Sequence, residues 1–78
     1  MEGYKHTLMS MLRNDGLIGV DEDFAEIEYK HGKMYVNGMK VSGSKEGFYC
    51  ALNEQYDVNR KNNMTIEITP QNLSITHY

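Results

Sequence analysis

The stretch that decides the fold runs from Phe24 to Val41, FAEIEYKHGKMYVNGMKV. It contains two short turn sequences, His31-Gly32 and Asn37-Gly38. Asn-Gly is the strongest short hairpin signal, because a type I′ turn needs positive φ at both central residues. His tolerates positive φ less well than Asn, but His31-Gly32 can form the same two-residue loop. The stretch therefore predicts a three-stranded antiparallel meander.

The two turns set a pairing register that sorts the side chains between two faces. A loop at Asn37-Gly38 pairs Val36 with Met39, and a loop at His31-Gly32 pairs Ile27 with Val36. Directly opposite residues share a face, and a slip of one residue would destroy the pattern. The predicted core face collects Ala25, Ile27, Tyr29, Met34, Val36, Met39 and Val41. The predicted polar face collects Glu26, Glu28, Lys30, Lys33, Tyr35 and Lys40.

Two helices and a second hairpin are expected around the meander. An apolar stripe predicts a helix from Glu2 to Asn14, which Asp15-Gly16 ends with Gly16 in a left-handed conformation. A second helix is expected from Lys45 to about Tyr56, capped by Ser44. Its core side is predicted to carry Phe48, Leu52, Gln55 and Tyr56. The alternating tail from Met64 predicts a hairpin with Pro70-Gln71 in its turn and a bulge near Asn72.

This order of elements predicts an α+β fold. The expected architecture is a two-layer sandwich of order α-β-β-β-α-β-β, an antiparallel meander plus a C-terminal hairpin with two helices on one face. A chain of 78 residues allows one domain, so residues 1–78 are taken as a single small α+β domain. An alternative interpretation makes Asp21 to Lys30 a helix, with Phe24 and Ile27 three residues apart. The order in which the two hairpins join the sheet stays open.

Size and composition restrict the classes of function. A chain of this length buries only about 60% of its unfolded surface, so an enclosed site for a large cofactor would consume the core, and no cofactor is expected. The 8 Lys and Arg residues are scattered among 11 Asp and Glu, for a net charge of −3, which argues against nucleic-acid binding. The apolar runs are far shorter than the roughly 20 residues that span a bilayer, so no direct membrane insertion of this segment is expected.

The residues with potential chemistry form no recognisable catalytic or metal-binding constellation. The histidines His6, His31 and His77 fall on a predicted helix, a turn and the tail. The acidic cluster Asp21, Glu22, Asp23 and Glu26 lacks the spacing of a calcium loop and suits a solvated linker. The single cysteine, Cys50, has no visible partner to activate it and is expected to be a structural thiol. We therefore expect no enzyme activity, no metal site and no cofactor site.

The polar face of the meander is the predicted site of partner binding. Tyr35 is expected there between Glu28 and Lys40, and exposed tyrosine is typical of protein interfaces. The alternative is local packing, with the ring of Tyr35 lying on the methylenes of Lys40. The candidate partner-binding residues are Tyr35, Glu26, Glu28 and Lys40.

Part of the chain resembles a known bacterial domain. The resemblance rests on Asp15-Gly16-Leu17-Ile18, on Asp23, on the hairpin KMYVNGMK from Lys33 to Lys40, and on the spaced residues Tyr49, Leu52 and Tyr56. This pattern is similar to a small cell-envelope domain of Bacteroidetes, of uncharacterised function. Such domains resemble the extracytoplasmic tails of antibiotic-sensing membrane metallopeptidases.

The resemblance covers about Leu8 to Tyr56 and departs from the family pattern in two places. The family commonly follows its hairpin with Gln-Pro, where this chain has Val41-Ser42-Gly43. The zinc-binding HExxH of the metallopeptidases is absent, so no peptidase activity carries over. The resemblance implies a non-enzymatic, periplasmic or extracytoplasmic module within a longer precursor.

The leading hypothesis is a non-enzymatic protein-interaction or sensory module of a bacterial cell-envelope protein. Its partner would be another protein, bound on the polar face or at an open edge strand. Edge pairing could also form a homodimer. The alternative is a stand-alone small inhibitor or regulator of a larger protein, for example one encoded by a phage. A native start at Met1 would favour the alternative, and an upstream signal or anchor the leading hypothesis.

Overall fold

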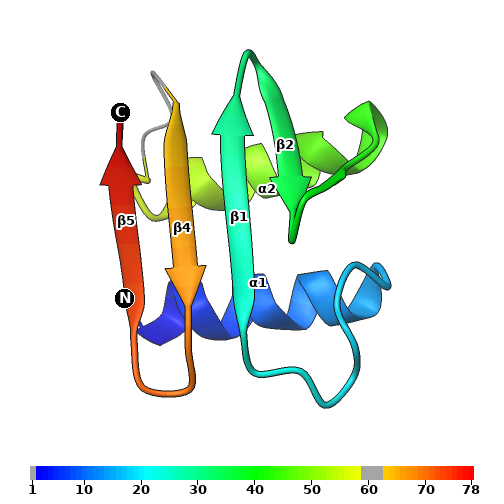
Figure 1. Cartoon of the computed structure of the whole chain (residues 1–78), viewed down its shortest axis with the longest axis vertical. Coiled ribbons are helices and arrows are strands. Elements are labelled where there is room, and N and C mark those ends of the chain that lie inside the picture. The colour runs from blue at the N-terminus through cyan, green and yellow to red at the C-terminus, as the bar shows by residue number, and fades with distance from the viewer. Residues whose placement is uncertain (1, 59–62) are drawn as a thin grey trace.

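The computed structural model describes residues 2–58 and 63–78, which form two helices and five strands in two layers (Figure 1). The elements are α1 (Glu2–Asn14), β1 (Ala25–Lys30), β2 (Lys33–Val36), β3 (Met39–Lys40), α2 (Gly43–Gln55), β4 (Met64–Ile68) and β5 (Leu73–His77). Their sequence confirms the predicted α-β-β-β-α-β-β order. Both helices lie on the same face of the sheet and run across its strands.

The five strands form one antiparallel sheet of order β3-β2-β1-β4-β5. The meander and the C-terminal hairpin join through β1 and β4, a pairing that the sequence had left open. Ala25 lies opposite Ile68 and Ile27 opposite Ile66, so the apolar residues of the two hairpins share a face. That shared face is the one the helices cover.

Two left-handed turns set the register of the meander. His31 and Gly32 have φ values of 53° and 74°, and Asn37 and Gly38 have 49° and 86°. These are the positive angles that type I′ turns require. The pairs Ile27–Val36 and Val36–Met39 form as predicted. The alternative helix over this region is wrong, because residues 25–30 form a strand.

The end of α1 also forms as predicted. Gly16 has φ of 72°, its N–H donates to the Arg13 carbonyl (3.0 Å), and the Leu17 N–H donates to the Leu12 carbonyl (2.9 Å). This is a Schellman motif, which brings Leu17 back onto the core.

The start of α2 differs from the prediction. The helix begins at Gly43 instead of Lys45, and its cap residue is Ser42 instead of Ser44. The Val41 N–H still donates to the Met34 carbonyl of β2 (2.9 Å), and the Ser42 carbonyl already accepts the N–H of Glu46 (2.9 Å). The chain therefore passes from sheet to helix with almost no connecting loop.

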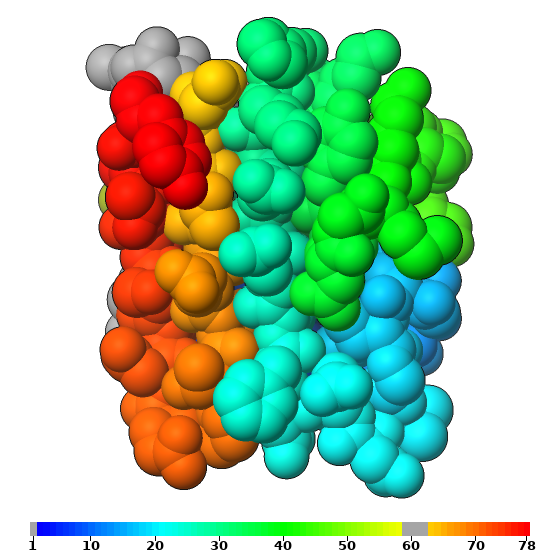
Figure 2. Space-filling model, viewed as in Figure 1, coloured from blue at the N-terminus to red at the C-terminus, as the bar shows by residue number. Residues whose placement is uncertain are grey.

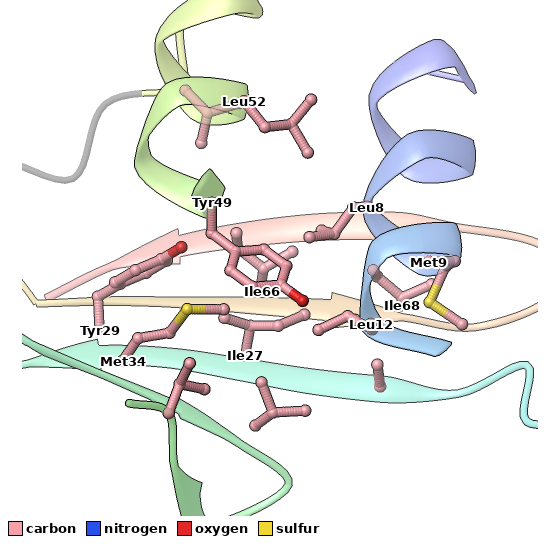
Figure 3. Close-up of a cluster of buried hydrophobic side chains, with 14 of the residues drawn as sticks. Leu8, Met9, Leu12, Ile27, Tyr29, Met34, Tyr49, Leu52, Ile66 and Ile68 are labelled. Atoms are coloured by element: carbon pink, nitrogen blue, oxygen red, sulfur yellow. The ribbon is translucent and has the colours of Figure 1, made fainter. Parts of the chain in front are cut away.

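The buried face of α2 was predicted correctly only in part: Leu52 is buried and Tyr56 packs against the core as predicted. Tyr49, Leu52 and Asn53 are buried, whereas Phe48 is 68% exposed. The observed spacing is a regular helical stripe, rotated by one residue from the predicted one. The Tyr49 hydroxyl donates to Asp15 Oδ2 (2.7 Å), which holds the helix in this rotation. Figure 3 shows the Tyr49 side chain directed from α2 toward the sheet.

Met39 is a second correction. It pairs with Val36 as predicted, but its side chain is 74% exposed instead of buried. Met39 lies on the two-residue edge strand β3, whose two residues are both exposed.

The bulge predicted in the C-terminal hairpin is absent. Pairing runs unbroken from Met64–His77 to Ile68–Leu73. Beyond it, Thr69 and Asn72 exchange backbone hydrogen bonds of 2.9 and 3.3 Å. Pro70-Gln71 therefore forms a plain two-residue turn.

The core fills the space between the helices and the sheet. Its fully buried side chains include Tyr4, Leu8, Leu12, Ile27, Met34, Val36, Tyr49, Met64, Ile66 and Ile68. Asn53 is the polar member of this layer, and it lies 1% exposed. Its Oδ1 accepts the Tyr4 hydroxyl (2.6 Å) and its Nδ2 donates to the Tyr29 hydroxyl (3.1 Å). Asn53 thereby joins α1, α2 and β1 in one hydrogen-bonded chain.

Adjacent residues on β2 give a direct test of the two faces. Val36 is buried, so Val36→Asp places an unpaired carboxylate in the core and should cost about 4 kcal/mol or more, comparable with the whole stability of such a domain. Tyr35→Ala on the opposite face should leave the protein folded. Urea denaturation followed by circular dichroism measures both variants. Equal stability of Val36→Asp and the parent chain would contradict the face assignment.

The buried tyrosines predict a loss of stability at high pH. Burial raises the pKa of Tyr4 and of Tyr49 above the usual value, and the hydrogen bond from Tyr49 to Asp15 raises it further. The folded state thus favours the neutral phenol of each tyrosine. The contribution of these two tyrosines to the free energy of unfolding is therefore complete below about pH 10, and it declines as pH rises above that value. In urea denaturation at several pH values, Tyr4→Phe with Tyr49→Phe should flatten this decline. If the free energy of unfolding of the double variant fell with pH as steeply as that of the parent chain, the prediction would be contradicted. Measurements at pH 7 provide the baseline stability of each protein.

Candidate functional site

The sheet has a second face that the helices leave uncovered, here called the outer face. Figure 2 views this face, with the strands lying side by side in front. Its residues alternate along each strand with those of the core. The outer face comprises Glu26, Glu28 and Lys30 of β1, Lys33 and Tyr35 of β2, Lys40 of β3, Thr65 and Glu67 of β4, and Ser74 and Thr76 of β5.

The register brings most of the predicted site residues together. Lys40, Tyr35 and Glu28 lie directly opposite one another on three successive strands. The same line continues through Thr65 and Thr76 to the far edge. Glu26 lies two residues from Glu28 on the same face. All four predicted partner-binding residues therefore share one continuous surface.

Tyr35 is half-buried beneath a lysine side chain. The Lys30 ammonium lies 4.9 Å from the centre of the Tyr35 ring, within cation–π range. Lys30 also approaches the Glu28 carboxylate at 3.9 Å. Solvent-exposed ion pairs of this kind contribute little to stability. The cation over the ring comes from Lys30, and Lys40 lies directly opposite Tyr35 on β3.

Two carboxylates oppose each other on the inner strands β1 and β4, near one end of the outer face. Glu26 on β1 lies directly opposite Glu67 on β4. The Asn37 N–H donates to the Glu26 carbonyl (2.8 Å), so the backbone N–H and C=O groups of Glu26 point toward β2 and away from β4. The two glutamates are thus a non-hydrogen-bonded pair, the arrangement with Cα atoms only about 4.5 Å apart and side chains closest. Like charges placed this way destabilise a sheet.

Glu67 is the member of this surface that sequence reasoning missed. Its alternation with Ile66 and Ile68 indicated an outward side chain, but the neighbour of β4 in the sheet was unknown. Only the pairing of β1 with β4 places it beside Glu26. In the described part of the chain, the ion pairs are Arg13–Asp23 and Lys30–Glu28, so no cation of these residues forms an ion pair with Glu26 or Glu67.

A shallow cleft of about 290 Å³ lies along α1 and offers a weaker candidate. Among its lining residues are Lys5, Arg13 and Asp23. Lys5 Nζ donates to the Thr69 carbonyl (2.6 Å), and Arg13 donates to the Glu22 carbonyl (3.0 Å) and pairs with Asp23 (3.6 Å). These cations bind the protein's own loops and fasten them to the helix.

The residues with potential metal or nucleophilic chemistry are dispersed. His6 lies on α1, His31 in the first turn and His77 at the end of β5. Cys50 is half-buried on α2. The acidic linker, residues 21–23, is exposed as expected. Within residues 2–58 and 63–78, no group of three or more His, Cys, Asp or Glu side chains could hold a metal ion.

Comparison with protein-family models, with curated proteins and with solved structures returned no significant match. The resemblance to envelope domains of Bacteroidetes therefore stays a prediction. None of the helices in the described ranges has the length and hydropathy needed to cross a bilayer.

Proposed function

We propose that this protein is a non-enzymatic interaction module that binds another protein through its outer face. The observation that carries the proposal is the opposed pair Glu26 and Glu67 on an uncovered sheet. A cation in place of either glutamate would stabilise the sheet at this position. The two glutamates therefore lower the stability of the fold, and a role in binding would explain why they are present.

The charges of the outer face indicate the partner's chemistry. Lys30, Lys33 and Lys40 surround Tyr35 toward the β3 edge, whereas Glu26 and Glu67 lie on the inner strands β1 and β4. A complementary partner would present basic groups to the glutamates and an apolar or acidic group beside Tyr35. The half-buried Tyr35 ring supplies contact area that loses little side-chain entropy on binding.

The biological setting of the proposal rests on the sequence resemblance. That resemblance supports a protein-interaction or sensory module of a bacterial cell-envelope protein, located in the extracytoplasmic space. Partner binding through the outer face is independent of this setting, because it rests on the sheet and its charges.

Affinity capture with matched charge variants tests the proposal. The parent chain is compared with Tyr35→Ala and with Glu26→Gln combined with Glu67→Gln, using lysate of the source organism and quantitative mass spectrometry. We expect a protein retained by the parent chain to fall roughly tenfold with each outer-face variant, because central contacts carry most of the binding energy.

A control with the same change in net charge separates the outer face from general electrostatics. Glu22→Gln with Glu54→Gln removes two exposed carboxylates from the linker and from α2. This control should retain the partner. Equal retention by parent and outer-face variants, or loss with the control alone, would contradict the proposal.

A further inference from the structure

The two edges of the sheet differ in how they are closed. The β3 edge is only two residues long and carries Lys40. Beyond it, the Met34 N–H of β2 donates to Glu46 Oε1 of α2 (3.0 Å), so the helix caps the position where β3 has left the sheet. Short strands and lysine side chains are common protections of a sheet edge.

The β5 edge has neither protection. Its five residues, Leu73 to His77, contain no proline, no lysine and no bulge. The hydrogen bonds at Thr69–Asn72 and from the Tyr78 N–H to the Asn63 carbonyl (2.9 Å) fix which groups face β4. By the antiparallel alternation, the N–H and C=O groups of Leu73, Ile75 and His77 point outward from the sheet.

The side chains of this edge are incompletely covered. Leu73 and Ile75 face the core layer, opposite Ile68 and Ile66, yet both are half-exposed. A further strand beside β5 would extend the sheet and cover these two side chains. The only titratable side chain on the strand is His77, so a neighbouring strand meets no fixed charge.

A second copy of β5 fits this edge in antiparallel orientation. With the two-fold axis at Ile75, each Ile75 lies opposite its equivalent, and each Leu73 lies opposite the other copy's His77. The outward groups of Leu73, Ile75 and His77 then fall into register and form about six hydrogen bonds. Ser74 and Thr76 lie opposite each other on the outer face, where hydroxyl pairs are favourable.

The helices give a second reason for a copy of the same chain. α1 begins and α2 ends at the β5 side of the molecule (Figure 1). A two-fold axis perpendicular to the sheet therefore brings the N-terminal end of α1 toward the C-terminal end of the other copy's α2. These ends carry opposite partial charges, so this orientation brings unlike helix ends to facing sides of the two copies.

We propose that two copies of this chain pair through β5 around a two-fold axis at Ile75, forming one continuous ten-stranded sheet. The site is independent of the proposed outer-face function and would leave two outer faces on the same side of the dimer. A single-strand contact lies at the small end of protein interfaces, so the dimer should dissociate on dilution.

Sedimentation equilibrium of the full chain tests the pairing. We expect the apparent mass to rise from 9.0 kDa toward twice that value as concentration increases into roughly the high micromolar range. Ile75→Lys should raise the dissociation constant at least about tenfold, since an edge lysine opposes its own equivalent across the axis. Met39→Lys, the matched change at the other edge, should leave it unchanged.

Cross-linking provides a readout that does not depend on the stability of Ile75→Lys. In a Cys50→Ser background, Ile75→Cys should form a disulfide-linked dimer under mild oxidation, because opposed residues of this pair type lie about 5.5 Å apart. Met39→Cys in the same background should not. A mass that stays at 9.0 kDa at all concentrations, or cross-linking through Met39→Cys alone, would overturn the proposal.

Discussion

The structure depends on the register that two left-handed turns impose on the meander. The two-residue turns His31-Gly32 and Asn37-Gly38 fix the pairing register of β1, β2 and β3. Ile27 and Val36, which lie opposite each other, must therefore face the same side of the sheet. Because that side is apolar, it must be covered, and α1 and α2 cover it. Asn53 of α2 then fixes how the helices pack on the sheet, because its side-chain amide forms hydrogen bonds with Tyr4 of α1 and with Tyr29 of β1. Losing its amide would leave the buried Tyr4 hydroxyl without this acceptor, which costs about 1–3 kcal/mol.

Covering one face has consequences for the other. Both helices lie on the same side, so the outer face must meet either solvent or a partner. Its inner strands β1 and β4 hold Glu26 and Glu67 directly opposite each other, at a position where an opposite charge would have stabilised the sheet. The edge at β3 is shortened and capped by Glu46, whereas β5 ends the sheet with its outward backbone groups in regular order. The two surfaces thus differ in chemistry: the charged outer face is the proposed site for a different protein, and the uncharged β5 edge is the proposed site for a second copy.

Much of this fold follows from local patterns, and the errors have identifiable causes. The turns, the Schellman motif at Gly16 and the face of each strand depend on near neighbours in sequence, so they could be predicted. The rotation of α2 could not, because the hydrogen bond from Tyr49 to Asp15 joins residues far apart in the chain. Met39 pairs with Val36 as predicted, but it lies on the short edge strand β3, where its side chain stays exposed. The residues of the candidate site on β1, β2 and β3 could be predicted from the sequence. Glu67 could not be placed beside Glu26, because that requires knowing that β4 pairs with β1.

The measurement that tests the account most directly is a double-mutant cycle across Glu26 and Glu67. The free energy of unfolding is determined by urea denaturation for the parent, for Glu26→Gln, for Glu67→Gln and for both together, at low and high salt. The account predicts that each single change stabilises the protein by about 0.2–1 kcal/mol, that the double change gains less than their sum, and that salt reduces the effect. Additive effects, or destabilisation by either change, would show that the two carboxylates do not repel each other. That result would remove the physical basis for assigning the outer face to a partner.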